Sequence, residues 1–283
     1  MAALASHLVA AQQARKKALV IPREHGAWGI LLVPLATGAV AGLRSSGRVS
    51  DVVFFVVVTL SLFRLRTPVE SLFGTSAMRV QNEGERRFVL KAVIGCAAIS
   101  TAALAMLLWN GRNFPLLIVG VVAGLAFVAQ AQVKRMGRKG RMPAQIVGAI
   151  GLTSTAAGAY AVATGRLDAI ALGLWLANWL FAGDQIHFVQ VRIHGSRAVS
   201  LEEKLAAGGR FFLGQIALIG LVLGACRYGL LPKTIPLAFI PVLARGTLWL
   251  VPGRKPLNVH RLGFTELAHA VIFGVLTSLA FLV

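Results

Sequence analysis

The chain is poor in charge, and above all in acid. Only 14% of its 283 residues are charged, with 10 aspartates and glutamates against 29 lysines and arginines. It has two cysteines, Cys96 and Cys226, each inside an apolar run, and this spacing excludes a disulfide framework or a cysteine metal site. Hydrophobic residues make up 57% of the chain, and the mean hydropathy is +0.74. Because the apolar residues come in repeated long runs, the sequence predicts an all-α polytopic membrane protein without a soluble domain.

The excess of basic residues bears on the partners of the protein. A formal net charge of +19 would suit nucleic-acid binding. The lysines and arginines lie in short tracts between apolar runs, as control of membrane topology requires, so we expect the lipid bilayer as partner and no nucleic acid. In residues 1–20, Arg15, Lys16 and Lys17 follow the apolar part, whereas a signal peptide carries its charges first. Residues 1–20 are therefore predicted to be a cytoplasmic segment and residues 21–283 a single transmembrane domain.

Nine apolar windows are long enough to cross the roughly 30 Å of hydrocarbon in a bilayer. They lie at 26–43, 52–73, 89–109, 114–133, 144–164, 168–191, 211–231, 234–251 and 264–283. With the N-terminus inside, the cytoplasmic connections contain twenty lysines and arginines and the outer connections six. The positive-inside rule then predicts nine transmembrane helices, N-in and C-out. The longest polar connections, 74–88, 134–143 and 195–210, would all be cytoplasmic.

Ionisable residues within or beside these windows are candidates for a functional site, because a charge in hydrocarbon is costly. In the first two windows they are Arg23, Glu24, His25, Arg64, Arg66 and Glu70. The first three belong to the stretch PREHGAW at 22–28, for which an interfacial anchor is the alternative. Arg66 and Glu70 are one helical turn apart and can pair, and the arginines would either hold an anionic head group or extend to the interface.

The strongest signal is the polar stretch Trp175 to His194 in the sixth window. Asp184 and His187 are three residues apart, so they share a helical face, and Glu266 and His269 repeat this spacing in the last window. Two carboxylate-x-x-His pairs could together bind Fe²⁺, Mn²⁺ or Zn²⁺. Alternatively, the two acids pair with Arg66 and Arg245, and each histidine hydrogen-bonds a neighbouring helix. We expect the second arrangement, because the arginines need anionic partners, so a metal is not favoured.

The predicted orientation places these groups at one depth, in the cytoplasmic half of the membrane, and so predicts a cavity open to the cytoplasm. Asp184 and His187 are the candidates for a base. The other candidate ligand-binding residues of the later windows and loops are Arg141, Asn178, Arg192, Arg245, Glu266 and His269. Two spacings of small residues, Gly120 to Gly124 and Gly220 to Gly224, are predicted to be helix-packing grooves.

Three motifs, PREHGAW at 22–28, R-x-R-x-P at 64–68 and G-x-x-E at 263–266, resemble the YwiC-like family of bacterial integral membrane proteins. The resemblance implies a location in the bacterial cytoplasmic (inner) membrane and implies no particular activity. More distantly, nine helices with long cytoplasmic loops after the second, fourth and sixth are similar to the UbiA superfamily of intramembrane prenyltransferases. This similarity implies a UbiA-like helical bundle.

The chain departs from that superfamily where a prenyl diphosphate and Mg²⁺ would bind. The superfamily has two Asp-rich motifs, whereas this chain has Asn82, Glu83 and Glu85 at the first position and Asn178 and Asp184 at the second. A Mg²⁺ cofactor is therefore not supported, although a transition metal is compatible with the residues present.

Two hypotheses for function follow. The first is a UbiA-like protein that binds, and transfers or modifies, an isoprenoid, quinone or other lipid with an anionic head. Arg64, Arg66 and Arg245 would hold the head, and the enzyme, if it is one, would be prenyltransferase-like without clear Asp-rich motifs. The second is a transporter or proton-coupled carrier in which Asp184, His187, Glu266 and His269 form a relay.

Overall fold

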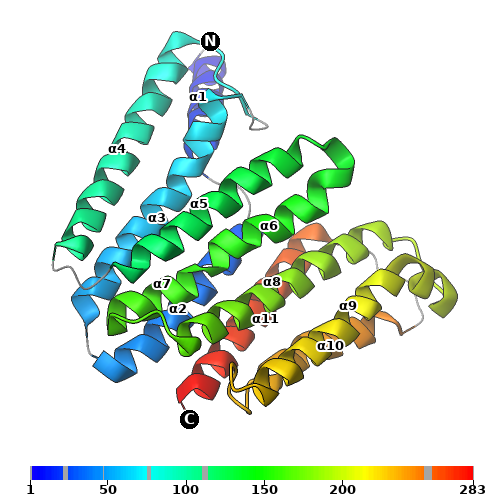
Figure 1. Cartoon of the computed structure of the whole chain (residues 1–283). Coiled ribbons are helices and arrows are strands. Elements are labelled where there is room, and N and C mark those ends of the chain that lie inside the picture. The colour runs from blue at the N-terminus through cyan, green and yellow to red at the C-terminus, as the bar shows by residue number, and fades with distance from the viewer. Residues whose placement is uncertain are drawn as a thin grey trace. The chain divides into compact units, whose positions relative to one another are not determined.

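The computed structural model describes residues 2–21, 25–46, 48–74, 78–109, 114–251 and 257–282. Every regular element in these ranges is helical, as the sequence predicts (Figure 1). The helices form two compact units. The first unit consists of α1 (Ala2–Val20), α3 (Val49–Leu72) and α4 (Glu83–Leu108). The second consists of α2 (His25–Ser46), α5 (Pro115–Lys134), the 3₁₀ turn η1 (Gly137–Gly140), α6 (Arg141–Thr153), α7 (Thr155–Thr164), α8 (Ala169–His194), α9 (Leu201–Arg227), α10 (Pro236–Trp249) and α11 (Val259–Leu282).

Each of the nine predicted windows overlaps a helix, but fewer segments are long and apolar enough to cross a membrane. Within the described residues there are 7: Gly26–Arg44, Val49–Leu72, Glu83–Leu108, Pro115–Lys134, Met142–Thr164, Leu201–Arg227 and Val259–Leu282. Helix α10 is apolar but has only 14 residues, and α8 carries polar residues such as Asn178, Asp184 and Gln185 along its middle. The protein is thus a multi-pass membrane protein by its helices, with 7 candidate spans in place of the predicted nine.

Two helices extend beyond their apolar windows because their first turns are capped. Asn82 accepts a hydrogen bond from the backbone N–H of Glu85 at 2.8 Å, so α4 begins at Glu83. Ser200 and Glu203 form a capping box, so α9 begins at Leu201. Caps of this kind supply partners for backbone N–H groups that a helix leaves unpaired at its start. Residues 83–88 and 201–210, predicted to be parts of loops or short amphipathic pieces, are thus the first turns of the long helices α4 and α9.

In the first unit, α1 is fastened to the other two helices by its C-terminal half. Arg15 donates to the Glu85 carboxylate at 2.6 Å and to the backbone carbonyl of Arg79 at 3.0 Å. The Ser71 hydroxyl of α3 donates to the carbonyl of Leu19 at 3.1 Å. The segment predicted to be a cytoplasmic extension is thus a docked helix.

In the second unit, α2 and α7 approach at two glycines one helical turn apart. A Cβ atom added to Gly38 would lie 2.0 Å from the carbonyl oxygen of Ala156, and one added to Gly42 would lie 2.6 Å from the Cβ of Ala163. Any larger side chain at these positions would push the two backbones apart, as at small-residue contacts between membrane helices in general.

The glycine pairs that the sequence singles out do not have this role. A Cβ atom added to Gly120 or Gly124 on α5, or to Gly220 or Gly224 on α9, would meet no atom of the described residues within 4 Å. The prediction of helix-packing grooves at these positions was wrong for contacts among the described residues. Spacing alone cannot distinguish a glycine at a helix crossing from one on an open face.

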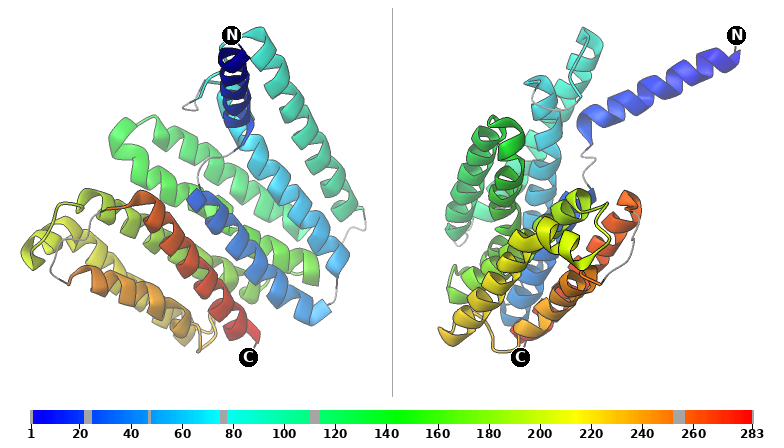
Figure 2. Two further views of the ribbon diagram at one scale, coloured as in Figure 1. Left: turned by 180° about the vertical axis from the view of Figure 1, so that it is seen from behind. Right: turned by 90° about the vertical axis from the view of Figure 1, so that its right-hand side faces the viewer.

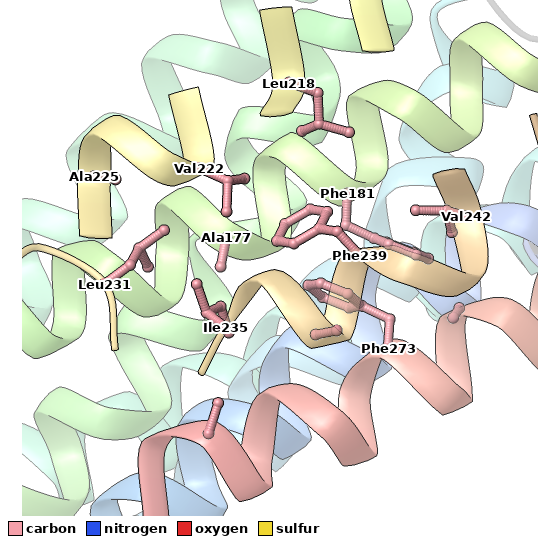
Figure 3. Close-up of a cluster of buried hydrophobic side chains, with 13 residues drawn as sticks. Ala177, Phe181, Leu218, Val222, Ala225, Leu231, Ile235, Phe239, Val242 and Phe273 are labelled. Carbon is pink, nitrogen blue, oxygen red and sulfur yellow. The ribbon is translucent and has the colours of Figure 1, made fainter. Parts of the chain in front are cut away.

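Helices α8 to α11 share an aromatic core, which Figure 3 shows in close-up. The rings of Phe181 on α8 and Phe273 on α11 stack with centroids 4.1 Å apart, and Phe239 on α10 meets Phe273 edge-on at 5.2 Å. Leu218 and Val222 of α9 complete this cluster. Figures 1 and 2 show α8 between α6 and α9, so the helix with the polar stretch lies inside the second unit.

The α2–α7 crossing makes a test of the packing. We expect Gly38→Ala to lower the thermal denaturation midpoint of the protein in detergent, because the added methyl group overlaps a backbone carbonyl, and overpacking of this kind costs roughly 1–3 kcal/mol. Gly120→Ala is the matched control, and it should leave the midpoint unchanged or raise it, since alanine favours helix over glycine by about 1 kcal/mol. Equal effects of the two substitutions would contradict the crossing.

Candidate functional site

Arg245 of α10 lies between two carboxylates from neighbouring helices. Its Nη2 donates to Asp184 Oδ2 of α8 at 2.6 Å, and its Nη1 donates to Glu266 Oε2 of α11. The three side chains are 8%, 4% and 7% exposed, respectively. The expected pairing of Asp184 and Glu266 with Arg245 is thus confirmed. Arg66, the other arginine expected to pair with these acids, instead donates to Glu70 of its own helix at 3.1 Å, so that part of the expectation was wrong.

Two buried glutamines, Gln185 and Gln215, bond to this cluster of Arg245, Asp184 and Glu266. We call these five side chains the ionic layer. Gln215 of α9 donates to Asp184 Oδ1 at 3.2 Å, and Gln185 of α8 donates to the backbone carbonyl of Glu266 at 2.8 Å. Gln215 reaches Asp184 past Gly246, where an added Cβ atom would lie 2.4 Å from the glutamine Nε2. A side chain at position 246 would therefore displace the amide of Gln215 that donates to Asp184. All four helices α8 to α11 contribute to the layer.

The aromatic core packs against one side of the ionic layer. Each of the four helices places a buried apolar residue three or four positions from its polar one: Phe181, Leu218, Val242 and Ala270. On α8 and α10 the apolar residue precedes the polar one, and on α9 and α11 it follows. Because consecutive helices of this set run in opposite directions (Figures 1 and 2), the four apolar residues lie on the same side of the layer.

A groove of about 250 Å³ opens beside the layer between α8, α10 and α11. Its lining consists of Phe188, Arg192, Pro241, Ala244, Arg245, Leu248, Trp249 and His269. The guanidinium of Arg245 lies over the ring of Phe188, 4.0 Å from its centroid, which is cation–π geometry. With Arg245 held by two acids, Arg192 and His269 are the remaining basic side chains of the lining, and the rest is apolar.

Trp249 forms one end of the groove, and its ring packs against Gly195 and Gly208 on the side away from the groove. Cβ atoms added to Gly195 or Gly208 would lie 2.9 and 2.6 Å from its ring, so the indole packs directly on both backbones. The buried Lys204 of α9 donates to the carbonyl of Val251 at 2.5 Å, just after the end of α10. This end of the groove is therefore part of the packed structure.

The histidines predicted beside the acids have different surroundings. The ring of His187 meets Phe211 of α9 edge-on at 5.4 Å and does not line the groove. His269 does line it, and its Nδ1 lies 2.7 Å from the carbonyl oxygen of Thr265. Since Thr265 belongs to the same helix, the expectation that this histidine bonds a neighbouring helix was wrong. On α8, the residues at the site are Asp184, Phe188 and Arg192, which follow one another at intervals of four. The sequence predicted His187, three residues after Asp184, in place of Phe188.

Asn178, another predicted ligand-binding residue, connects two helices. Its amide donates to the Thr37 hydroxyl of α2 at 3.1 Å and to the carbonyl of Leu174 at 2.8 Å, and it is 2% exposed. Both amide N–H groups are thereby used within the protein.

The remaining predicted residues are not part of the groove lining or are outside what the structure describes. Arg64, which is exposed, Arg66 and Glu70 belong to the first unit. Arg23 and Glu24 lie outside the described residues, as do the side chains of His25 and Arg141.

The four candidate metal ligands do not converge. Asp184 and Glu266 share the guanidinium of Arg245, while His187 packs on α9. Within the described part of the chain, no group of three or more histidine, cysteine, aspartate or glutamate side chains is placed to hold a metal ion.

Several site residues were not predicted from the sequence. Gln215 interrupts an otherwise apolar run on α9, and this polar residue is the signal that could have identified it. Phe188 follows Asp184 by four residues, which places it on the same face. Trp249 and Gly246 flank the site on α10 without any local sequence signal.

Comparison with protein families identifies part of the chain. Residues 21–160 match the family model described as YwiC-like protein, which confirms the resemblance stated above for the part of the chain from the start of α2 into α7. Two of the three motifs, at 22–28 and 64–68, lie in the matched part, whereas Asp184, Arg245 and Glu266 lie beyond it. No curated protein matches the chain.

The ionic layer makes a stability prediction. Arg245→Met should lower the denaturation midpoint strongly, because loss of one partner from a buried ion pair costs roughly 3–5 kcal/mol. Adding Asp184→Asn and Glu266→Gln to the same chain should restore much of this loss, since no buried charge is then left uncompensated. A triple variant no more stable than Arg245→Met alone would show that the layer is not held by charge compensation.

Proposed function

We propose that this protein binds an anionic amphiphile, such as an isoprenoid, quinone derivative or lipid with an anionic head, in the groove between α8, α10 and α11. The observation that carries the proposal is the composition of the lining: Arg192 and His269 provide a basic edge, and Pro241, Ala244 and Leu248 provide an apolar wall. Ligand sites are commonly apolar clefts with a few polar groups that fix orientation.

The surface of α10 supports an amphiphile over a small soluble anion. Beyond the groove lining, Leu237 and Ile240 of the same helix are 57% and 53% exposed, and Leu248 in the lining is 61% exposed. The apolar wall thus continues into a strip of exposed apolar side chains, along which an acyl or isoprenoid chain can lie in contact with the bilayer.

In this proposal Arg192 binds the head group, whereas the sequence hypothesis assigned this role to Arg64, Arg66 and Arg245. Arg245 already donates to two carboxylates, so its guanidinium is compensated within the protein. Arg192 is half-buried and lies at the groove, where its guanidinium can donate to a phosphate-like head. Arg245 is then a positioning residue, which holds Phe188 and the two acids in place.

Binding is the function that this geometry supports best. For transfer chemistry Asp184 would have to act as a base, and its two oxygens already accept from Arg245 and Gln215. His187, the second candidate base, packs on α9 away from the lining. UbiA-like transfer therefore needs a rearrangement of the ionic layer, whereas binding does not.

The membrane arrangement belongs to the same proposal. We place α8 and α10 in the bilayer in addition to the 7 candidate spans, because both helices pack against spans: α8 against α9, and α10 against α11. Nine spans with the N-terminus inside would put the groove in the cytoplasmic half of a bacterial cytoplasmic membrane, as the distribution of lysine and arginine favours.

Native mass spectrometry of protein purified in a maltoside detergent, followed by titration with soluble lipids, tests the proposal. We expect co-purified anionic lipid, and binding of dioctanoyl phosphatidylglycerol in preference to dioctanoyl phosphatidylcholine. Dimethyl phosphate, which has the charged head without chains, should bind far more weakly. Arg192→Gln should weaken phosphatidylglycerol binding by roughly 10- to 100-fold, the effect of one lost hydrogen bond to a charged group.

Arg210→Gln is the matched control, since Arg210 is an exposed arginine on α9 outside the lining. Its affinity for phosphatidylglycerol should equal that of the unmodified protein. Equal losses in both variants would indicate unspecific attraction to a basic surface, and the groove would then be excluded as the binding site.

A proton-coupled carrier is the second candidate function. It is favoured by one observation, namely that two buried carboxylates share a single guanidinium at the centre of α8 to α11. A buried acid whose charge is only partly compensated can take up and release a proton during transport. Substrate-dependent proton flux into proteoliposomes that is lost in Asp184→Asn would establish this function, and unchanged flux in that variant would exclude this relay.

A further inference from the structure

We propose that binding of an anion in the groove is coupled to uptake of one proton by His269. The inference rests on the proposed function, because it concerns the same groove and the same class of ligand. It adds a second ligand, the proton, and a direction for the effect of pH on affinity.

The hydrogen bond of His269 determines which ring nitrogen is available. Nδ1 lies 2.7 Å from the carbonyl oxygen of Thr265, one turn earlier on α11. A carbonyl oxygen can only accept, so Nδ1 carries a hydrogen in both charge states of the ring. The proton that changes the charge is therefore the one on Nε2, and protonation there turns the ring from an acceptor into a donor.

The charges that face His269 are balanced when the groove is empty. From α8 come Asp184 and Arg192, from α10 comes Arg245, and Glu266 lies one turn before His269 on α11. His269 interacts electrostatically with both carboxylates, and Arg192 interacts with Glu266. Two guanidinium groups thus face two carboxylates.

Among the side chains that the structure describes, α2 adds no charge at this level. From α2, which also packs on α11, Gly29 faces Leu267 and Ala270. Within the described residues, the charges around the ring are thus those of the four ionic side chains of α8, α10 and α11.

An anionic head in the groove disturbs this balance by at least one negative charge. Of the eight side chains in the lining, two are guanidinium groups that are already charged and five are apolar or aromatic. His269 is the remaining one, and imidazole is the side chain whose charge changes near neutral pH. The anion therefore favours the protonated ring, and by reciprocity the protonated ring favours the anion.

The sign of the pH effect follows from this linkage. Affinity should be high at low pH, where His269 is charged in both states, and should fall as the pH rises past the point where the ring of the unliganded protein loses its proton. For one coupled proton the affinity changes at most about tenfold per pH unit. The effect levels off once the ring is neutral in both states.

The test uses the full chain in a maltoside detergent and a head group that does not itself titrate. Dioctanoyl phosphatidylglycerol is a phosphodiester, and its affinity is measured between pH 5.5 and pH 8.5, with dimethyl phosphate as the head group without chains. We expect affinity for phosphatidylglycerol to rise several-fold from the alkaline to the acidic end. Calorimetry in two buffers of different ionisation enthalpy should show proton uptake on binding.

Variants identify the group that takes up the proton. His269→Gln lacks the charge of the protonated ring, so it should bind phosphatidylglycerol at every pH only about as weakly as the unmodified protein does at alkaline pH, and with no proton uptake. His260→Gln is the matched control, because His260 is an exposed histidine on the same helix, in edge-on contact with Phe264. It should retain the full pH dependence.

The outcomes separate this inference from the function on which it rests. Phosphatidylglycerol binding without proton uptake, or pH dependence that persists in His269→Gln, would overturn the coupling and leave the binding site in place. No preference for phosphatidylglycerol over phosphatidylcholine at any pH would overturn both. Proton uptake is measured on the unmodified protein, so the result does not depend on the folding of a variant.

Discussion

The arrangement of α8 to α11 depends on one constraint, the burial of a guanidinium together with two carboxylates. An ion inside a membrane protein is stable only when its partners are close and well oriented. Arg245 meets this requirement by donating to Asp184 and Glu266, so α10 is tied to α8 on one side and to α11 on the other. Gln215 adds α9 through its bond to Asp184. The register of the four helices is set by these bonds, and the aromatic core and the groove take their positions relative to this layer.

Helix α8 owes its central position to the same polarity that makes it a poor membrane span by composition. Three of its side chains donate to three different helices: Trp175 to the carbonyl of Ile150 on α6, Asn178 to Thr37 on α2, and Gln185 to the carbonyl of Glu266 on α11. A donor that faced lipid would remain unpaired, at a cost of several kcal/mol. A helix with this many donors is therefore stable only where other helices surround it. Low hydropathy in α8 reflects its burial within the second unit and does not indicate a loop.

The sequence allows partners of the buried charges to be predicted, but it does not show which face of α8 lies at the site. Charge balance is a global property, and few acids are available, so Arg245 could be inferred as a partner of Asp184 and Glu266. That both acids share it, while Arg66 pairs with Glu70, could not be inferred. On a helix, the residues three and four positions after Asp184 both lie near its face. The position of α10 determines that Phe188 and Arg192, which follow at steps of four, line the groove, and that His187 does not. The capping residues Asn82 and Ser200 are local signals and could have extended two helices. Gly38 could not have been distinguished from Gly120, because the difference is the carbonyl of a helix more than a hundred residues later.

The charge balance of the ionic layer also explains how a binding groove can exist beside a structural cluster. Arg245 donates to both Asp184 and Glu266, so the layer holds the helices together whether or not a ligand is present. Had Arg245 been the contact to an anionic head, each binding event would have removed a partner from two buried acids, with a penalty comparable to breaking a buried pair. Arg192 is half-buried at the groove, and its partial hydration makes an exchange of partners less costly. Stability and ligand affinity are thereby assigned to different arginines of neighbouring helices, and a substitution at one need not impair the other.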